Sequence, residues 1–315
     1  MEIGGFIGLE CNGLSPYHEH YLSFNSCNNA LKYYLLKKKV KTIYLPYYTC
    51  PSVWNAVTDC GCRIIPYEVS DKFYPTDNLN PKSAYIVFNN YFGICDEIIE
   101  ELTEKYNNVI VDNAQAFYSQ LIGNAAIYSP RKFFGVPDGG LLISDLKENS
   151  DLPISYSYTE FDHLLKRVDL SSDEAYPDYR KNEELIGTFT MKKMSKLTES
   201  MLNSIDYANI KQRRISNFNY LNKKLSSINK EKVRLAKQSV PMVYPFYTEY
   251  SELRKKLISK KIYVAKYWAA DGLSKCMTTI QSTSLANNIV PLPIDQRYSE
   301  KDMDYIVEVI GELIN

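Results

Sequence analysis

Residues 108–144 contain the stretch that decides the fold. They open with Asn108-Val109-Ile110-Val111-Asp112-Asn113-Ala114-Gln115 and, after a short break, continue with Tyr128-Ser129-Pro130-Arg131-Lys132-Phe133-Phe134-Gly135-Val136-Pro137-Asp138-Gly139-Gly140 and the apolar run Leu141-Leu142-Ile143. A β-branched run that ends in Asp is typical of a buried parallel strand, because such strands are covered on both faces and carry polar residues at their carboxyl ends. We therefore expect Asp112 at the mouth of a site. Lys132 stands between Pro130 and a Gly-rich turn, which predicts a lysine on a restrained backbone.

Each of these two residues alone has a simpler interpretation. An Asp at a strand end often caps a helix or a turn, and a Lys beside a Gly turn is usually solvated. Together they indicate a more specific chemistry. An Asp that pairs with a pyridinium nitrogen and a Lys amine that bonds to an aldehyde are the two protein groups that pyridoxal phosphate (PLP) chemistry requires.

In this stretch the chain resembles the DegT/StrS family of nucleotide-sugar aminotransferases, which have the aspartate aminotransferase fold, fold type I. The hallmarks of that family are Asp-x-x-(His/Gln)-Ala at a strand end and a Ser-x-x-x-x-Lys segment that closes on Gly-(Asp/Glu)-Gly-Gly. Residues 112–116 and 132–140 match them. The resemblance implies that Lys132 bonds to PLP, that Asp112 holds its pyridinium, and that Gln115 lies beside the ring substituents.

A phosphate site is expected at the start of the first helix. Ser26 or Asn28 can cap this helix, and a helix N-terminus binds phosphate through unpaired backbone N–H groups. The family grips the cofactor phosphate here with Ser-Gly-Thr-x-Ala, where this chain has Ser26-Cys27-Asn28-Asn29-Ala30. The resemblance implies N–H donors at Cys27 and Asn28. Where the family has a serine five residues before the lysine, this chain has Ile127. Because strand side chains on one face repeat every second residue, we expect Ser129 to point to the same face and to take over the role of that serine.

Two further positions depart from the family. Its Pro-x-x-Thr-aromatic segment, in which the aromatic residue stacks on the cofactor ring, has Cys50 at the aromatic position. Tyr47 or Tyr48 either stacks on the ring instead or packs under the next helix, and the sequence leaves both open. Met191 takes the place of an Asn that reaches the phosphate of the partner subunit. We therefore expect PLP to bind more weakly than is usual for the family.

The remaining pattern predicts an α/β fold with a mostly parallel central sheet and helices on both faces. Strands are expected at 42–46, 62–67 and 84–88, alternating with helices that start at Pro51 and Glu97. Such alternation implies right-handed βαβ units, with ligands beyond the carboxyl ends of the strands.

Two domains are expected: a large PLP-binding domain over 1–195, which opens with an extended arm over 1–25, and a smaller C-terminal α+β domain with an interdomain helix over 196–315. Residues 151–178 mix helix-like and loop patterns. Periodicity predicts a long helix over about 195–225, a strand over 240–247, a helix over 251–259 and a closing helix over 302–313.

Composition excludes several classes of partner. Lys+Arg and Asp+Glu both number 37, so net charge does not favour nucleic acid or an anionic membrane, and no apolar run approaches the roughly 20 residues that span a bilayer. Seven cysteines without a basic-then-apolar leader favour the reducing cytoplasm. Cys60 and Cys62 are too close in sequence for a zinc knuckle. His18 and His20 are interpreted as part of a polar surface segment, so no metal site is expected.

These features favour a PLP-dependent aminotransferase that moves an amino group from an amino acid, with glutamate expected, to a keto-sugar nucleotide. We expect a homodimer, because the family completes each phosphate site from the neighbouring chain and the apolar arm with Phe6, Ile7 and Leu9 has little to pack on within one subunit. A sugar dehydratase of the same fold is disfavoured, since that branch replaces Lys132 with His. The alternative is a non-catalytic descendant that uses the fold for binding or regulation.

Overall fold

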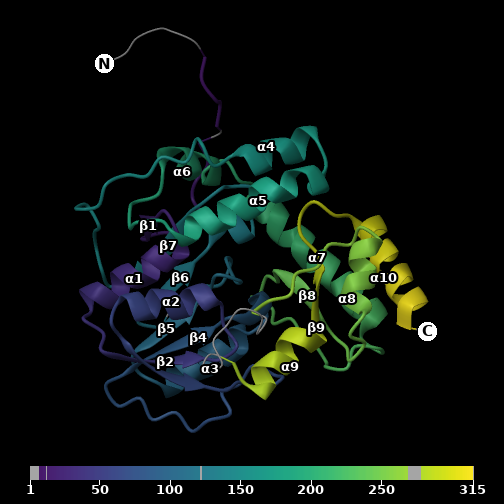
Figure 1. Ribbon diagram of the computed structural model, residues 1–315, viewed down its shortest axis with the longest axis horizontal. Coiled ribbons are helices and arrows are strands. Elements are labelled where there is room, and N and C mark those ends of the chain that lie inside the picture. Colours follow the sequence, from purple (N-terminus) through teal and green to yellow (C-terminus); the bar gives the residue numbers. More distant parts are fainter. Residues whose placement is uncertain (1–6, 12, 121–122, 269–277, 315) are drawn as a thin grey trace.

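Across residues 7–11, 13–120, 123–268 and 278–314, which the computed structural model describes, a seven-stranded sheet lies beside a two-stranded one (Figure 1). The strands of the large sheet are β1 (Leu22–Phe24), β2 (Thr42–Pro46), β3 (Arg63–Tyr67), β4 (Tyr85–Asn89), β5 (Val109–Asp112), β6 (Ala125–Tyr128) and β7 (Gly140–Ser144). Their order is β1-β7-β6-β5-β4-β2-β3, and only β7 is antiparallel to its neighbours within the described residues. The predicted mostly parallel sheet is confirmed.

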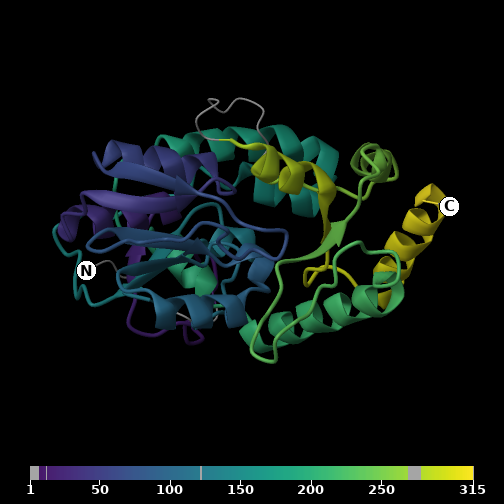
Figure 2. The same ribbon diagram turned by 90° about the horizontal axis from the view of Figure 1, so that it is seen from below.

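Helices cover both faces of the large sheet (Figure 2). The apolar side chains of α1 (Cys27–Lys37) and α2 (Pro51–Asp59) pack on one face, and those of α3 (Asp96–Lys105) on the other. Two short 3-10 helices, η1 (Tyr91–Gly93) and η2 (Pro130–Lys132), follow β4 and β6. The α1 and α2 segments match the helices predicted after Ser26 and from Pro51.

The strand register brings functional residues to one edge of the sheet. Asn89 pairs with Asp112 between β4 and β5, and Asp112 pairs with Ile127 between β5 and β6. Side chains alternate between the two faces of a strand. Since Ile110 and Ile127 belong to the core under α1 and α2, Asp112 lies on that same face, beyond the apolar part of its strand.

The C-terminal part packs against the large sheet from the side, drawn in green and yellow in Figure 1. Its antiparallel strands, β8 (Val243–Tyr247) and β9 (Ile289–Pro293), are joined by α8 (Leu253–Ser259) and α9 (Ile280–Asn288), and α10 (Glu300–Ile314) follows. The predicted strand, helix and closing helix of this part are confirmed with shifted ends, whereas α9 and β9 were not predicted. The division into domains at residue 195 stays a prediction.

The long helix predicted over 195–225 is wrong. The structure has α6 (Lys196–Leu202) and α7 (Tyr207–Leu225) instead. Asn203 ends α6, and Asp206 caps α7 by accepting a hydrogen bond from the N–H of Asn209 at 3.1 Å. Short polar side chains of this kind compete with helical hydrogen bonds and favour caps, which explains the break.

Residues 151–178 are more regular than their sequence pattern indicated. They hold α4 (Asp162–Asp169) and the first part of α5 (Ser172–Gly187), which pack against each other. Ser171 and Glu174 form a reciprocal capping box at the start of α5. The spacing of these two residues is a recognised helix-start signal, so the sequence did contain the information for this helix.

Within the described part of the N-terminal arm, residues 7–11 and 13–16 form neither helix nor strand and are exposed. Ile7 is 87% exposed, whereas Phe6 lies outside the described residues. The surface interpretation of the histidines is wrong for His18, which is buried with its Nε2 atom 2.6 Å from the carbonyl oxygen of Phe117. Burial lowers the pKa of His18 to about 4, so this histidine is neutral and packs in the core. Among the described helices, none is long and apolar enough to span a membrane.

Candidate active site

Asp112 ends β5 in a nearly closed environment. It is 8% exposed, and its Oδ1 atom accepts a hydrogen bond from the N–H of Ala114 at 2.9 Å. Burial raises the pKa of the Asp112 carboxyl, and the positive charge of Lys132 acts in the opposite direction. A buried carboxyl whose ionised form needs a cation is suited to a protonated ring nitrogen.

Lys132 is the last residue of η2, and its neighbours on both sides are held. Its N–H donates to the carbonyl of Ser129 at 3.1 Å, and the N–H of Phe133 donates to the carbonyl of Pro130 at 2.9 Å. Arg131 forms an ion pair with Glu183 of α5. Backbone bonds and flanking anchors thus fix the place where the half-buried lysine side chain begins.

The start of α1 lies next to these two residues. Asp112 and Lys132 both act on the Cys27 thiol, whose pKa is raised above its ordinary value, first by burial and then by the Asp112 charge. Ser26 caps α1, with its Oγ atom accepting from the N–H of Asn29 at 3.2 Å. The N–H groups of Cys27 and Asn28 lie in the first turn of α1, a position from which helices bind anions.

Close packing holds this helix start against β7. A Cβ atom added to Gly140 would lie 2.4 Å from the Cys27 nitrogen and 2.3 Å from the carbonyl carbon of Ser26. Only glycine allows so close an approach of two backbones. The Gly-rich turn after Lys132 therefore sets the position of the predicted phosphate site.

The start of α2 meets the start of α1. Cys50 is the N-cap residue of α2, and its Sγ atom lies 3.1 Å from the Ser52 hydroxyl, which donates to the Oδ1 atom of Asn28 at 3.4 Å. The structure thus brings Asn28 and Cys50 together through Ser52, and Cys27 lies within reach of the charges of Asp112 and Lys132. The binding roles of these residues stay predictions.

Gln115 carries a polar group that points to a missing partner. Its Oε1 atom accepts from the N–H of Phe92 at 2.9 Å, but its buried Nε2 atom has no hydrogen-bond partner in the part of the chain that is described. A buried amide donor without a partner is costly, so its presence favours a ligand acceptor at this place. The residues present therefore fit PLP.

Tyr48 and Ser129, two predicted cofactor residues, are both buried. Tyr48 is 1% exposed, and its ring stacks on Tyr91 with a centroid separation of 5.5 Å, so it is part of the aromatic core. Ser129 directly follows β6, which ends at Tyr128, and is the buried N-cap residue of η2. Ile127 is buried in the core and offers no donor. The binding roles of Tyr48 and Ser129 stay predictions.

Several contacts that hold the site were not predicted. Besides the ion pair of Glu183, the Nδ2 atom of Asn182 in α5 donates to the carbonyl of Pro137 at 2.8 Å, and the Nδ2 atom of Asn89 donates to the Thr49 hydroxyl at 2.7 Å.

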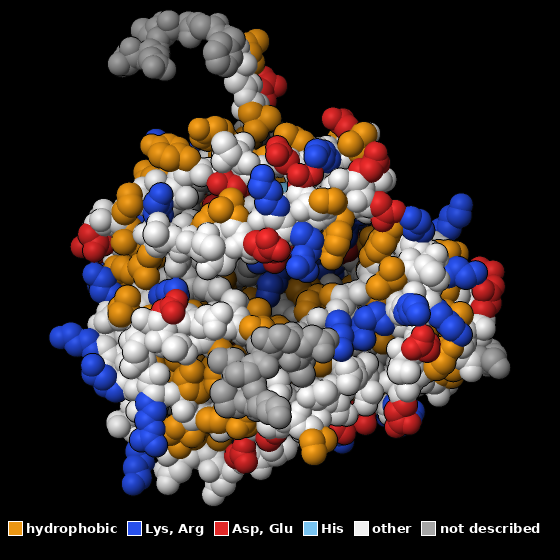
Figure 3. Space-filling model, viewed as in Figure 1, with side chains coloured by type: hydrophobic (Ala, Val, Ile, Leu, Met, Phe, Trp, Pro, Cys, Tyr) orange, Lys and Arg blue, Asp and Glu red, His pale blue; other side chains and the backbone are white. Residues whose placement is uncertain are grey.

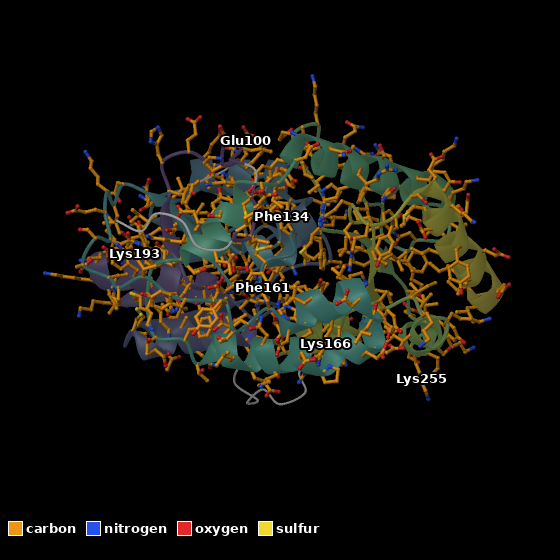
Figure 4. All side chains as sticks on the ribbon, turned by 90° about the horizontal axis from the view of Figure 1, so that it is seen from above. Glu100, Phe134, Phe161, Lys166, Lys193 and Lys255 are labelled. Atoms are coloured by element: carbon orange, nitrogen blue, oxygen red, sulfur yellow. The ribbon has the colours of Figure 1, made fainter. Side chains whose placement is uncertain are left out.

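The face shown in Figure 3 is hollowed near its middle, with Lys and Arg side chains in and beside the hollow. Figure 4 places Phe134, in the turn after Lys132, near the centre of the molecule.

Comparison with known proteins identifies the family. The model of the DegT/DnrJ/EryC1/StrS aminotransferase family matches residues 14–311. The chain belongs to this family. Membership confirms the predicted family, the aminotransferase class and the dependence on PLP. No curated protein matches the sequence significantly.

Solved structures agree on the fold of this DegT-family chain. The aminotransferase TlmJ from Streptoalloteichus hindustanus is 16% identical, with a TM-score of 0.66 over 92% of this chain and 84% of that one. The sugar aminotransferase CalS13 from Micromonospora echinospora is 16% identical, with a TM-score of 0.64 over 93% and 87%. NtdA from Bacillus subtilis, solved with bound PMP, is 13% identical, with a TM-score of 0.66 over 93% and 73%. At such identities the likeness shows the fold alone.

Proposed function

We propose that this DegT-family aminotransferase takes its amino group from an amino acid, with glutamate as the first candidate, and transfers it to a keto-sugar nucleotide. The observation that carries the proposal is the placement of the buried Asp112 at the end of β5 and of the half-buried Lys132, where the charge of each acts on Cys27 at the start of α1. Family membership supports the reaction class, and the substrates follow from the resemblance to nucleotide-sugar aminotransferases.

The residues divide the work among themselves. When bound, PLP supplies an aldehyde that bonds to amines and a ring that accepts electrons. Asp112 holds the proton on the ring nitrogen, where its own buried carboxyl gains a cationic partner. The Nζ atom of Lys132 is the amine that holds the cofactor covalently and moves a proton at the substrate Cα atom. The backbone donors of Cys27 and Asn28, with Ser129, bind the phosphate.

Gln115 and the aromatic residues complete this assignment. The Nε2 atom of Gln115, which has no partner among the described residues, would donate to a ring substituent of bound PLP. Cys50 stands at the start of α2 in the place of the aromatic residue of the family, and Tyr48 is the nearest aromatic substitute in sequence. Because Ile127 provides no donor and Cys50 no stacking ring, the chain is expected to hold PLP loosely.

A homodimer is part of the proposal. Ile7 and Leu9 are 87% and 74% exposed, and Tyr156 and Tyr158 are 76% and 73% exposed. Contiguous exposed apolar patches mark surfaces that a partner covers, and these four side chains are the candidates for such a patch. A second copy of the chain is the expected partner. The six described cysteines are free thiols, which agrees with the proposed cytoplasmic location.

The test is a half-reaction. Protein loaded with PLP is mixed with isotopically labelled glutamate, and release of 2-oxoglutarate is measured at one equivalent per subunit, followed by transfer to a panel of keto-sugar nucleotides. The altered positions Asn28, Cys50, Ile127 and Met191 favour one alternative, a non-catalytic descendant. Binding of PLP without release of any keto acid would support that alternative and contradict the proposed function.

A further inference from the structure

The carbonyl of Phe133, the residue after Lys132, is gripped by side chains from the C-terminal part of the chain. The Nε2 atom of Gln296 donates to this oxygen at 2.7 Å, and the Nη2 atom of Arg214 donates to it at 3.3 Å. The Arg214 guanidinium also lies 4.6 Å from the centroid of the Phe133 ring. Both the backbone and the side chain of Phe133 are therefore anchored.

Arg214 is placed to organise several segments at once. It projects from α7, is 2% exposed, and donates to the carbonyl of Met242 at 3.0 Å and to the Oε1 atom of Gln296 at 3.1 Å. Burial lowers the pKa of Arg214 to about 10, so the side chain stays charged at neutral pH. A buried cation is costly. The arginine compensates by donating from a planar, fixed fork of five N–H groups to several oxygens, whereas a lysine has three donors on a single nitrogen.

Gln296 is itself held by α7. The Nδ2 atom of Asn217, one turn after Arg214, donates to the carbonyls of Ile294 at 3.1 Å and Tyr298 at 3.0 Å, on either side of Gln296. The side-chain amide of Gln296 thus reaches the turn that follows Lys132, called the lysine turn below, from a short segment whose backbone is fixed. Its position depends on α7 as much as on its own segment.

The same contacts lead back to Gln115. The N–H of Met242 donates to the carbonyl of Phe92 at 2.7 Å, and the N–H of Phe92 donates to the side chain of Gln115 at 2.9 Å. Arg214 therefore stands between two predicted cofactor residues, joined to Lys132 through Phe133 and to Gln115 through Met242 and Phe92. The C-terminal part of the chain completes the rigid frame of the site.

We infer that Arg214 and Gln296 are positioning residues for Lys132, which hold its turn from the C-terminal part of the chain through the Phe133 carbonyl. The inference rests on the proposed role of Lys132. Neither residue is assigned to touch the substrate or the cofactor. Their effect is on the backbone that aims the reactive amine, and a displacement of that backbone lowers reactivity by loss of orientation.

Two substitutions separate positioning from simple support of the fold. Gln296→Leu removes the donor that lies 2.7 Å from the Phe133 carbonyl oxygen and leaves the Arg214 donor at 3.3 Å. Gln296→Glu also removes it but offers Arg214 a carboxylate, so contact with α7 is kept. The matched control is Asn229→Leu, because Asn229 is buried in the same part, donates to the carbonyl of Pro245 at 3.1 Å and does not reach the lysine turn.

The rate of borohydride-trapped adduct formation at Lys132 is measured at saturating PLP for each protein, with the melting temperature. Loss of one hydrogen bond predicts a rate about tenfold lower in both Gln296 variants. Asn229→Leu is expected to lower the melting temperature and leave the rate of the folded protein unchanged. An unchanged rate in both Gln296 variants, or an equal loss in Asn229→Leu, would overturn the inference.

A second readout needs no cofactor. Hydrogen exchange of the amides of residues 132–134, measured in protein without PLP, is expected to be about tenfold faster in Gln296→Leu than in wild type. If wild-type protein forms no adduct, the proposed role of Lys132 is wrong. The exchange rates then test on their own whether Gln296 holds the Phe133 carbonyl. Equal exchange in wild type and Gln296→Leu would then show that Gln296 does not hold the turn.

Discussion

The Asp112→Asn substitution separates a cofactor role from a structural one because the two predict opposite effects. Burial raises the pKa of Asp112 above its ordinary value of 3.8, so the folded protein binds this proton more tightly than the unfolded chain does. Ionisation therefore costs folding free energy as the pH rises through the folded-state pKa. The Asn side chain cannot ionise. Its Oδ1 atom can still accept the hydrogen bond that the N–H of Ala114 donates to Asp112 Oδ1 at 2.9 Å in the wild-type protein.

The expected result is a protein that folds as well as wild type but binds its cofactor poorly. At about pH 7 and without PLP, the variant should match or exceed the wild-type free energy of unfolding, and the gain should vanish at acid pH, where both side chains are neutral. Loss of a hydrogen bond between charged groups removes about 1.5–3 kcal/mol from PLP binding. That corresponds to roughly a 10- to 150-fold larger Kd.

Thermal unfolding and a PLP titration followed by absorbance measure both effects. Asp96→Asn is the control, since Asp96 is also buried but accepts hydrogen bonds from Asn90 at 2.7 Å, Ser119 at 2.8 Å and Ser239 at 2.6 Å. Replacing that carboxylate is expected to cost about 2–3 kcal/mol of stability and to leave PLP binding by the folded protein unchanged. The reasoning is refuted if Asp112→Asn loses stability as Asp96→Asn does, or binds PLP as wild type does.

Gly140→Ala should lower stability by about 1–3 kcal/mol and weaken PLP binding, because its Cβ atom would strike the backbone of Ser26 and Cys27, whereas Gly135→Ala, with open space around its Cα atom, should have little effect on either measurement. Titration of the apo-protein should give a micromolar Kd for PLP, and sub-micromolar binding would show that the altered phosphate and ring positions are compensated. Light scattering should report a dimer at tens of micromolar, and a monomer there would contradict the shared site.

The strands and the site edge could be predicted because their signals are local. A β-branched run ending in Asp112 requires only that its apolar residues be buried, and the Gly-rich turn after Lys132 is forced by a backbone approach that excludes a Cβ atom at Gly140. The cap at Ser26 could be predicted from the serine itself and from the helical pattern that follows it. Such features can be predicted without knowledge of the rest of the chain.

The contacts that hold the site could not be predicted, because they join residues far apart in sequence. Nothing near Lys132 indicates that Arg214 and Gln296 hold the following carbonyl, and nothing near His18 indicates that Phe117 and Tyr128 enclose its ring. The break between α6 and α7 is an intermediate case. Its caps were present in the sequence, but an apolar stripe that ran on past them favoured one long helix.

In the proposed site, Lys132 is the residue that bonds to PLP. Purified protein mixed with PLP and reduced with borohydride, then digested and mapped by mass spectrometry, should carry the pyridoxyl group on Lys132, and Lys132→Ala protein should carry none at stoichiometric level. Absence of any adduct on wild-type protein at millimolar PLP, or a stoichiometric adduct on another lysine, would contradict the account.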